Sequence, residues 1–478
     1  MEKKQEMAGP DRILHLLLYP FPGSSHTIPI LDLAHRLLAR PGITITILVT
    51  PGNLPLLQPL LAAHPHPSLQ PLILPAPPPP PTSTGTGPLN RLVSIIRGLH
   101  DLHSPALLDW FSSHASPPNA IVSDFFLGWT HHLARQLGIP RVVFSPSGVF
   151  GLSINFSLWR DLPKLGDTPE NEISFPKLPN CPSYPVWQIP EAYRNYAEVM
   201  DPSSEFHRDS MLADVASWGL VFNSFAELEG EYIEYLKRDL GHDRVWAVGP
   251  LLPTQDDQVV HRGGPSSIPA HEVMTWLDSC QDGSVVYVCF GSRGMLTSKQ
   301  MDELTAGLDQ SKVRFILCVR NPDGRQVATG YSSIPDGFED RVVGRGLVIR
   351  GWAPQLLILR HRAVGAFLTH CGWNSTIEGV TAGVVMLTWP MKADQFTNAK
   401  LLADQLGVGI RVGEGTMNIP EAVELARILT DSVNGARPER VRAKEISIAA
   451  LSAMKPEGSS DHDLDDFVKR ISEVKMSK

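Results

Sequence analysis

The sequence predicts an α/β protein made of two doubly wound domains, each with a parallel sheet. Two observations support this prediction. The chain has 478 residues, more than one hydrophobic core usually holds, so two domains of about 200 residues are expected. Short apolar or β-branched runs also alternate with segments of helical periodicity, and they do so in two separate series.

The first series opens with ILHLLLYPFP at 13–22, a short apolar run broken by prolines, as is typical of a buried parallel strand. A helical pattern over 27–40 and a β-branched strand over Ile43–Thr50 complete a strand–helix–strand unit. The same order of elements is predicted further along, at 120–126, 129–138 and 141–148.

The second series starts at SVVYVCFGS, Ser284–Ser292, which predicts another buried strand. Helix and strand patterns then alternate up to residue 390, over 301–311, 314–320, 346–352, 355–360, 364–370, from about Ser375, and 384–390. Between the two series, residues 251–273 are rich in proline, glycine and polar residues and show no periodicity, which predicts the connection between the domains.

Composition excludes several classes of protein. The formal net charge is -8, which argues against nucleic acid or an anionic membrane as partner. The five cysteines form no C-x-x-C pair and are odd in number, as expected for free thiols in a reducing compartment. The apolar segment 13–19 is too short to span a bilayer, and no secretory signal is visible. We therefore expect a soluble cytoplasmic protein without membrane insertion.

Several common catalytic motifs are missing from the sequence. There is no G-x-G-x-x-G after the first strand, no phosphate-binding P-loop and no G-x-S-x-G nucleophile elbow. These absences disfavour a dinucleotide dehydrogenase and a P-loop enzyme. The H-E-x-x-H zinc motif is also absent, so a zinc site has little support.

The stretch FLTHCGWNSTIE, 367–378, passes from a predicted strand into a predicted helix. His370 and Asn374 then lie at the carboxyl end of a strand, where open α/β sheets bind ligands, and free N–H groups at a helix start suit a phosphate. Ser375 and Glu378 also match a capping box, so a plain capped helix with a core histidine and a core Cys371 is an equally good interpretation.

His26 and Asp124 each follow a predicted strand of the first domain. A histidine beside a carboxylate is the usual general base with its orienting partner. Nearly a hundred residues separate the two, so an ordinary turn histidine and a plain loop cap remain alternatives. Ser292, at a third strand end, could contact a phosphate or simply turn the chain.

Residues Trp352–Gln395 resemble the 44-residue donor-binding signature of plant secondary-product UDP-glycosyltransferases, glycosyltransferase family 1. A tryptophan opens the segment, HCGWNS stands in its middle, and Asp-Gln closes it. The resemblance extends over nearly the whole chain, through YPFPGSSHTIP, SWGLVFNSFAELE, VWAVGPLLP and ADQFTNAKLL. Within the family the chain is most similar to members that glycosylate flavonols and small phenolic acids.

The resemblance implies a GT-B fold, with two Rossmann-like doubly wound domains facing across a cleft. Residues 1–252 would form the N-terminal, acceptor-binding domain and 253–272 the linker. Residues 273–454 would form the C-terminal domain that binds the UDP-sugar, and 455–478 a helix returning to the N-terminal domain. The protein is expected to be a monomer.

The resemblance also assigns the nucleoside part of the donor site. Trp352 would stack on the uracil ring, and Ala353, through its backbone, would complete the uridine pocket together with Gln355. Glu378 would bind the ribose hydroxyls. This role competes with the capping-box interpretation of the same carboxylate.

The rest of the donor would lie between two strand ends. The diphosphate would be held by Ser292, His370, Asn374 and Ser375. The sugar hydroxyls would be contacted by Trp373, Asp394 and Gln395. Within the family a terminal glutamine such as Gln395 favours glucose, and histidine is associated with galactose.

By the same resemblance, His26 is the catalytic base and Asp124 its partner in an inverting displacement without metal or cofactor. The implied enzyme is a hexosyltransferase that carries glucose from UDP-glucose to a flavonoid or small phenolic hydroxyl. Alternatives are UDP-rhamnose or UDP-xylose as donor, C-glycosylation of a phenolic, and a non-catalytic UDP-sugar-binding protein.

The chain departs from the family pattern in the catalytic loop. Gly23, Ser24 and Ser25 precede His26 where Ala-Gln-Gly is frequent, which leaves the approach of the acceptor open. The proline-rich segment 166–193 shows no periodicity, and we expect it to face the acceptor.

Overall fold

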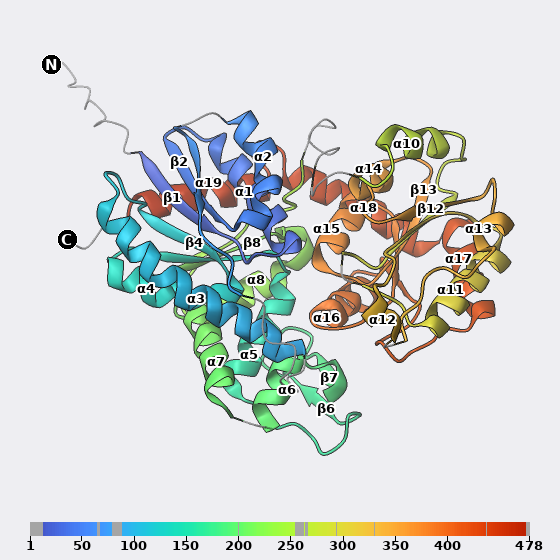
Figure 1. The fold of residues 1–478 in the computed structure, drawn as a ribbon, viewed down its shortest axis with the longest axis horizontal. Coiled ribbons are helices and arrows are strands. Elements are labelled where there is room, and N and C mark those ends of the chain that lie inside the picture. The colour runs from blue at the N-terminus through green and yellow to red at the C-terminus, as the bar shows by residue number, and fades with distance from the viewer. Residues whose placement is uncertain are drawn as a thin grey trace.

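A computed structural model describes residues 13–64, 67–78, 88–198, 200–253, 262, 266–292, 294–328, 330–435 and 437–474. Its N-terminal and C-terminal halves each contain one parallel sheet flanked by helices, and the halves lie side by side (Figure 1). The predicted fold class, two Rossmann-like domains, is therefore confirmed.

The first sheet has seven parallel strands in the order β3-β2-β1-β4-β5-β8-β9. The strands are β1 Leu14–Tyr19, β2 Ile43–Val49, β3 Leu69–Ile73, β4 Ala120–Asp124, β5 Arg141–Ser145, β8 Gly219–Phe222 and β9 Val245–Ala247. The order reverses direction between β1 and β4, which are neighbours in the sheet. Parallel α/β sheets bind ligands beyond the carboxyl ends of strands at such a switch point.

Strand β1 is buried on both faces because helices cover both sides of the sheet. Leu16 and Leu18 point to a core shared with α1 and α19, whereas Leu17 and Tyr19 point to a core shared with α3 and α4. The helices of this half are α1 Ser24–Leu38, α2 Leu54–Ala63, α3 Pro88–Ser113, α4 Thr130–Leu137, α5 Val149–Asp161, α6 Glu191–Glu198, α7 Pro202–Val215 and α8 Ala226–Leu240.

The second sheet has six parallel strands in the order β12-β11-β10-β13-β14-β15. The strands are β10 Val285–Cys289, β11 Arg314–Val319, β12 Gly346–Arg350, β13 Val364–Thr369, β14 Val385–Thr388 and β15 Gly409–Arg411. The order reverses between β10 and β13, so the ends of these two strands mark the second switch point.

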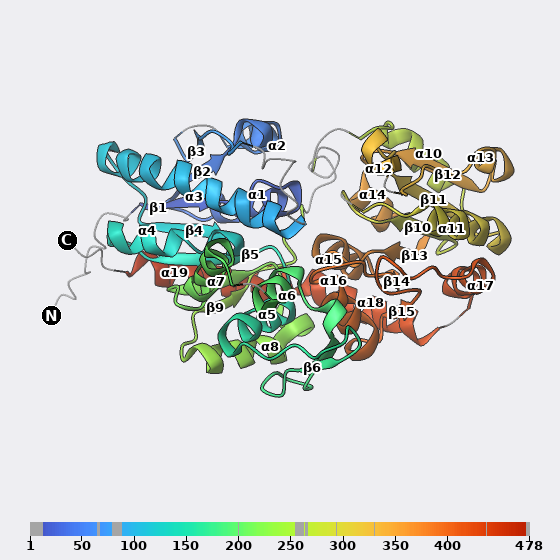
Figure 2. The same cartoon turned by 60° about the horizontal axis from the view of Figure 1, so that its bottom comes forward.

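Helices also cover both faces of the second sheet (Figure 2). They are α10 Ala270–Asp278, α11 Ser298–Ser311, α12 Gly324–Ala328, α13 Phe338–Arg341, α14 Gln355–Arg360, α15 Trp373–Ala382, α16 Gln395–Lys400 with a π-helical turn over Leu401–Gln405, α17 Ala422–Val433 and α18 Pro438–Ala453. Val288 and Leu317 face α11 and α17, whereas Tyr287 and Phe367 lie on the face of α14 and α15.

The last helix, α19 Ser459–Ser472, follows the second domain in the chain but packs on the first sheet (Figure 1). Leu464 and Phe467 enter the core under β1 and β2. Asp466 accepts a hydrogen bond from the indole of Trp246 on β9 at 2.8 Å. Apolar burial and this polar contact tie the C-terminal end of the chain to the N-terminal half.

Two segments differ from the sequence expectations. The segment 166–193 contains a two-stranded antiparallel hairpin, β6 Glu172–Ser174 and β7 Ser183–Pro185, and a short turn of helix, η3 Val186–Gln188. Strands of three residues are too short to show a period of two, so the pattern was missed. Helix α10 begins at Ala270, inside the predicted linker, of which 254–261 and 263–265 lie outside the described residues.

Candidate active site

His26 and Asp124 are in contact, as the hypothesis of a general base requires. His26 Nδ1 lies 2.7 Å from Asp124 Oδ2. The Asp124 carboxylate is fully buried, whereas the His26 side chain is 18% exposed. An ionised carboxylate only accepts hydrogen bonds, so Nδ1 carries the hydrogen and Nε2 is the basic nitrogen. The imidazole is thus anchored on its buried side and free to take a proton on the other.

Neighbouring strand ends bring the pair together. β1 leads into α1, whose second turn begins just after His26, and β4 ends at Asp124. Asp124 also caps the short helical turn η2 Phe125–Leu127, since its Oδ1 accepts the N–H of Phe126 at 2.9 Å. Asp124 therefore makes the contacts of both interpretations, because one oxygen caps the loop and the other binds the histidine.

Aromatic rings surround the candidate base. The His26 ring centroid lies 5.3 Å from that of Phe21, 5.1 Å from Phe126 and 6.1 Å from Phe125. Rings at such distances pack favourably against flat aromatic molecules. The surroundings of His26 therefore suit an aromatic acceptor.

In the second domain, His370 stands at the end of β13 beneath the start of α15. Its ring packs between two glycines: a Cβ added at Gly291 or Gly372 would come within 2.6 Å of it. Burial lowers the pKa of His370, and nearby Lys392 adds to this shift, so that the pKa is about 4. The imidazole is therefore neutral near pH 7 and can donate one N–H to an anion without carrying a charge.

Helix α15 begins at Trp373 with Gly372 as its N-cap, not after Ser375 as the capping box required. Ser375 is already inside the helix, so its hydroxyl cannot cap the first turn. The capping-box interpretation is wrong here. The free N–H groups of the first turn lie directly beside His370, an arrangement that suits an anion.

Three of the residues expected in the donor site contact one another. Gln355 Nε2 donates to Glu378 Oε2 at 2.8 Å and to Ser375 Oγ at 3.3 Å. The Tyr287 hydroxyl donates to Gln355 Oε1 at 3.2 Å. This chain of hydrogen bonds orients the buried Glu378 carboxylate, which is the group expected to bind ribose.

Glu378 also has a partner that the sequence did not suggest. Arg262, from the segment between the domains, forms an ion pair with Glu378 and with Asp32 of α1, the latter at 3.0 Å. The two carboxylates raise the pKa of Arg262. Asp32 is the single acidic residue among the apolar residues of the helical pattern over 27–40. This exception was the only feature of the sequence that could have indicated the ion pair with Arg262.

Three further residues expected in the donor site lie before α14 or after β10. Trp352, expected to stack on uracil, is partly buried, and its backbone carbonyl accepts the N–H of Ser267 at 2.9 Å. Ala353 is buried two residues before α14. Ser292, expected to hold the diphosphate, follows β10, and its carbonyl accepts a hydrogen bond from Arg320.

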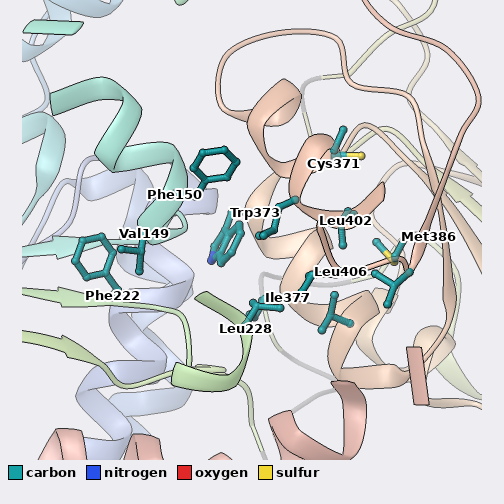
Figure 3. Close-up of a cluster of buried hydrophobic side chains, with 14 of the residues drawn as sticks. Val149, Phe150, Phe222, Leu228, Cys371, Trp373, Ile377, Met386, Leu402 and Leu406 are labelled. Atoms are coloured by element: carbon teal, nitrogen blue, oxygen red, sulfur yellow. The ribbon is translucent and has the colours of Figure 1, made fainter. Parts of the chain in front are cut away.

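The indole of Trp373 lies at the interface between the domains. It is 4% exposed and lies between the α5 residues Val149 and Phe150 and its own helix (Figure 3). Its Nε1–H donates to the carbonyl of Asn223 at 2.7 Å. The ring is therefore buried between the domains and its N–H is already bonded. A sugar contact by Trp373 would have to come from its backbone N–H.

Two further residues of the donor segment reach the first domain. Asn374 Nδ2 donates to the carbonyl of Ser25 at 3.0 Å, which places it beside the catalytic loop. The Ser147 hydroxyl donates to Asp394 Oδ2 at 2.6 Å. The diphosphate end of the candidate donor site therefore lies next to the His26 loop, and its sugar end lies next to the loop between β5 and α5.

Gln395, which follows Asp394, holds its own loop in shape. Its Oε1 accepts the backbone N–H groups of Met391 at 2.9 Å and Lys392 at 3.0 Å. The next residue, Phe396, packs edge-to-face against Trp187 at 5.2 Å between ring centroids. Segment 166–193 thus lies against the sugar end of the donor segment.

Cys371 is not placed as a nucleophile. Its side chain is fully buried, and burial raises the pKa of its thiol. Over the described ranges, no group of three or more His, Cys, Asp or Glu side chains could hold a metal ion. No helix in this part of the chain is long and apolar enough to cross a membrane.

The chain belongs to the UDP-glycosyltransferase family and is an enzyme of that class. A family model described as "UDP-glucoronosyl and UDP-glucosyl transferase" matches residues 249–434. The chain is 52% identical, over 97% of either sequence, to flavonol 3-O-glucosyltransferase UGT89B1 of Arabidopsis thaliana. It is 40% identical to flavonol 7-O-rhamnosyltransferase of the same plant, over 95% of this chain and 97% of that one.

Solved structures agree with the fold. Arabidopsis thaliana UGT89C1 complexed with UDP-L-rhamnose has a TM-score of 0.77 and 39% identity, covering 96% of this chain and 98% of that chain. The same protein complexed with quercetin has a TM-score of 0.76 and 38% identity, covering 96% and 99%. The GT-B architecture expected from the sequence is therefore confirmed.

Proposed function

We propose that this protein is an inverting O-glucosyltransferase that transfers glucose from UDP-glucose to a hydroxyl of a flavonoid. The observation that carries the proposal is the 2.7 Å contact between His26 and the buried Asp124, beside the loop that Asn374 contacts from the donor segment. A basic nitrogen, an aromatic surround and a donor segment meet there. The 52% identical flavonol glucosyltransferase supports the choice of acceptor and sugar.

The proposed reaction is a single displacement. His26 Nε2 takes the proton of the acceptor hydroxyl while that oxygen forms a bond to the anomeric carbon of the sugar. The bond from that carbon to the diphosphate oxygen breaks, and UDP leaves with the electron pair. Asp124 accepts the Nδ1–H of His26 and stabilises the imidazolium that forms.

The leaving diphosphate is proposed to lie against the first turn of α15. Backbone N–H groups of that turn, the neutral His370 and the side chains of Asn374 and Ser375 supply hydrogen bonds to the developing charge. Glu378, oriented by Gln355, would accept from the ribose hydroxyls. The mechanism proposed here uses no metal ion and no cofactor.

The test is product analysis with purified protein, UDP-glucose and a panel of flavonols. We expect a flavonol glucoside whose anomeric proton shows the large coupling of a β-linkage, and loss of turnover in His26→Ala. An α-linked product would contradict inversion, and wild-type turnover in His26→Ala would contradict the base assignment. UDP binding without turnover of any acceptor would instead indicate a binding protein.

UDP-rhamnose is the second candidate donor. A specific observation favours it, because the chain is 39% identical to a solved structure complexed with UDP-L-rhamnose. Direct competition between equal concentrations of UDP-glucose, UDP-rhamnose and UDP-xylose separates the candidates. Predominant transfer of glucose would support UDP-glucose as the donor. Predominant transfer of another sugar would contradict it and make the corresponding UDP-sugar the donor.

We further propose that the enzyme works as a monomer in the cytoplasm. Five free cysteines, four of them buried, and a net charge of -8 support a reducing compartment without an anionic membrane partner. Cell fractionation and size-exclusion chromatography with light scattering test the two statements separately.

A further inference from the structure

A fully buried ion pair lies behind the His26–Asp124 pair. Arg141, the first residue of β5, contacts Asp214 of α7 at 2.5 Å between Nη1 and Oδ1, and neither side chain is exposed. Removing two charges from water costs several kcal/mol for each ion, and a buried pair often adds no net stability. Folding alone therefore gives no reason for this pair to stand next to the candidate catalytic residues.

The guanidinium of Arg141 holds the chain on both sides of the catalytic carboxylate. Its Nη2 donates to the backbone carbonyl of Asp124 at 3.2 Å, and its Nε donates to the hydroxyl of Ser123 at 2.9 Å. Nη1 donates to Ser217 Oγ at 2.9 Å in addition to Asp214. A planar fork of fixed donors can hold several acceptors in one geometry, which a lysine cannot do.

The same network closes around the turn that follows Asp124. The Ser123 hydroxyl lies 2.7 Å from that of Thr130, which in turn donates to the carbonyl of Leu127 at 2.6 Å. This turn contains the Phe126 N–H that binds Asp124 Oδ1. Movement of Arg141 would therefore shift both the carbonyl of Asp124 and the group that orients its carboxylate.

Helix α7 packs directly on this turn. A Cβ added at Gly128 would lie 1.8 Å from the carbonyl of Ser210 on α7, so the backbones are in close contact. Asp214 belongs to the same helix, one turn further on. The ion pair thus joins α7 to the end of β4 at the point where Asp124 meets His26.

The charges in this region also depend on Arg141. Asp124 and Asp214 are both fully buried. Burial raises the pKa of Asp214 to about 7, and Asp124 adds to this rise, whereas the Arg141 guanidinium opposes it. Without the cation, the Asp214 carboxylate would lie in a low-dielectric interior with no charged partner, which favours its neutral form.

We propose that Arg141 and Asp214 form a positioning pair for catalysis, which holds Asp124 in the direction that His26 needs. The inference rests on the proposed function, because it takes His26 as the base. Neither residue touches a substrate in this account. Their effect reaches the reaction through Asp124, so it should appear in kcat and leave binding of the UDP-sugar unchanged.

The test compares Arg141→Met with the double variant Arg141→Met/Asp214→Leu. The single variant leaves Asp214 buried without its partner, so we expect it to unfold at a lower temperature and to turn over slowly. The double variant replaces the pair by apolar side chains of similar volume, which restores stability in known cases. We expect its unfolding temperature to recover while kcat stays about 10- to 100-fold low, as for a slightly misplaced catalytic group.

A partly exposed ion pair in the same domain serves as control. Arg160 and Asp239 lie 2.5 Å apart and join α5 to α8, outside the network around Asp124. The double variant Arg160→Met/Asp239→Leu should keep wild-type kcat. KM for UDP-glucose should stay within about twofold of wild type in both double variants, because the donor groups lie in the other domain.

Recovery of both stability and kcat in Arg141→Met/Asp214→Leu would overturn the inference, since the pair would then be purely structural. Ser123→Ala, which removes one hydroxyl of the network, keeps the proposal testable if the double variant does not fold. We expect it to fold and to lose about fivefold in kcat, and an unchanged kcat would contradict the proposal.

His26→Ala in the same experiment distinguishes a failure of the positioning pair from a failure of the base assignment. Loss of turnover in His26→Ala together with wild-type kcat in Arg141→Met/Asp214→Leu would reject the positioning pair alone. Wild-type turnover in His26→Ala would reject the base assignment and, with it, the positioning pair.

Discussion

The acceptor side and the donor side of the candidate site are held in different ways. His26 and Asp124 are placed entirely by the first domain, through adjacent strand ends and the network around Arg141. The donor residues Asn374 and Asp394 instead make hydrogen bonds to the first domain, at Ser25 and Ser147. Proton transfer should therefore depend on the packing of one domain, whereas donor binding should also depend on how the two domains meet.

The largest expected effect comes from a substitution that impairs the acceptor side alone. His26→Ala should lower kcat by about 10²- to 10⁴-fold, because the proton of the acceptor hydroxyl loses its base. Affinity for UDP, measured by calorimetry, should not change. His35→Ala is a matched control on the same helix, where His35 contacts His64 at 3.0 Å. A kcat loss in the control equal to that of His26→Ala would show that α1 was damaged and not the reaction.

The next largest effect comes from a substitution that impairs the donor side alone. Glu378→Gln keeps the size of the side chain but removes its charge, which should weaken UDP binding by about 10- to 100-fold. Calorimetric titration with UDP measures this directly. Glu424→Gln, at an exposed ion pair with Arg427 on α17, is the control. Equal UDP affinity in Glu378→Gln and the wild type would remove Glu378 from the ribose site.

A smaller effect concerns the contact between the two sides. Trp373→Phe keeps most of the ring but leaves the Asn223 carbonyl unpaired, at a cost of about 1–3 kcal/mol. We expect a thermal transition a few degrees lower and a raised KM for UDP-glucose. Trp110→Phe, on α3 of the first domain, controls for the general effect of replacing a tryptophan. An unchanged transition in Trp373→Phe would mean that the indole does not join the domains.

The smallest expected effect concerns how the folding stability of the two sides depends on acid pH. Burial lowers the pKa of His207 on α7 and of His370 to about 4 each. An unfolded histidine takes up its proton near pH 6.5, so between that pH and 4 the unfolded state binds more protons than the native state. Stability should therefore fall as the pH falls through this range.

Urea denaturation at pH 7 and pH 5 measures this dependence. Either His207→Gln or His370→Gln should reduce the slope of unfolding free energy against pH by an amount that corresponds to up to about one proton. The variant with the larger change identifies the half of the molecule that limits acid stability. An unchanged dependence in both variants would show that neither histidine stays neutral in the native state.

Much of the fold was predictable because its signals are local. Buried parallel strands such as β1 and β10 read as short apolar runs, and α1 and α11 show the helical period. The hairpin β6–β7 was missed because three-residue strands carry no usable period. The start of α15 was placed two residues too late, because the capping-box pattern at Ser375 competed with the true N-cap at Gly372.

The candidate site was predictable only in part. The positions of His26 and Asp124 at strand ends, and the pattern of the donor segment, pointed to the residues. The partners of those residues could not be read in the same way. Arg141 begins an apolar strand and Asp214 lies near the end of a helix, and 73 residues separate them in the chain. Nothing in either local pattern indicates that they meet behind Asp124.

The sequence by itself thus determined the fold class, the family and the identity of the groups that face the two strand ends. The fold class follows from periodicity, and the family and its site residues follow from the resemblance that the motifs carry. Both kinds of signal are properties of short stretches of chain. Only the tertiary structure decided which oxygen of Asp124 binds His26, that the Trp373 indole packs between the domains, and that Glu378 is not a helix cap. Those outcomes depend on burial and on contacts between distant segments, and no local pattern records them.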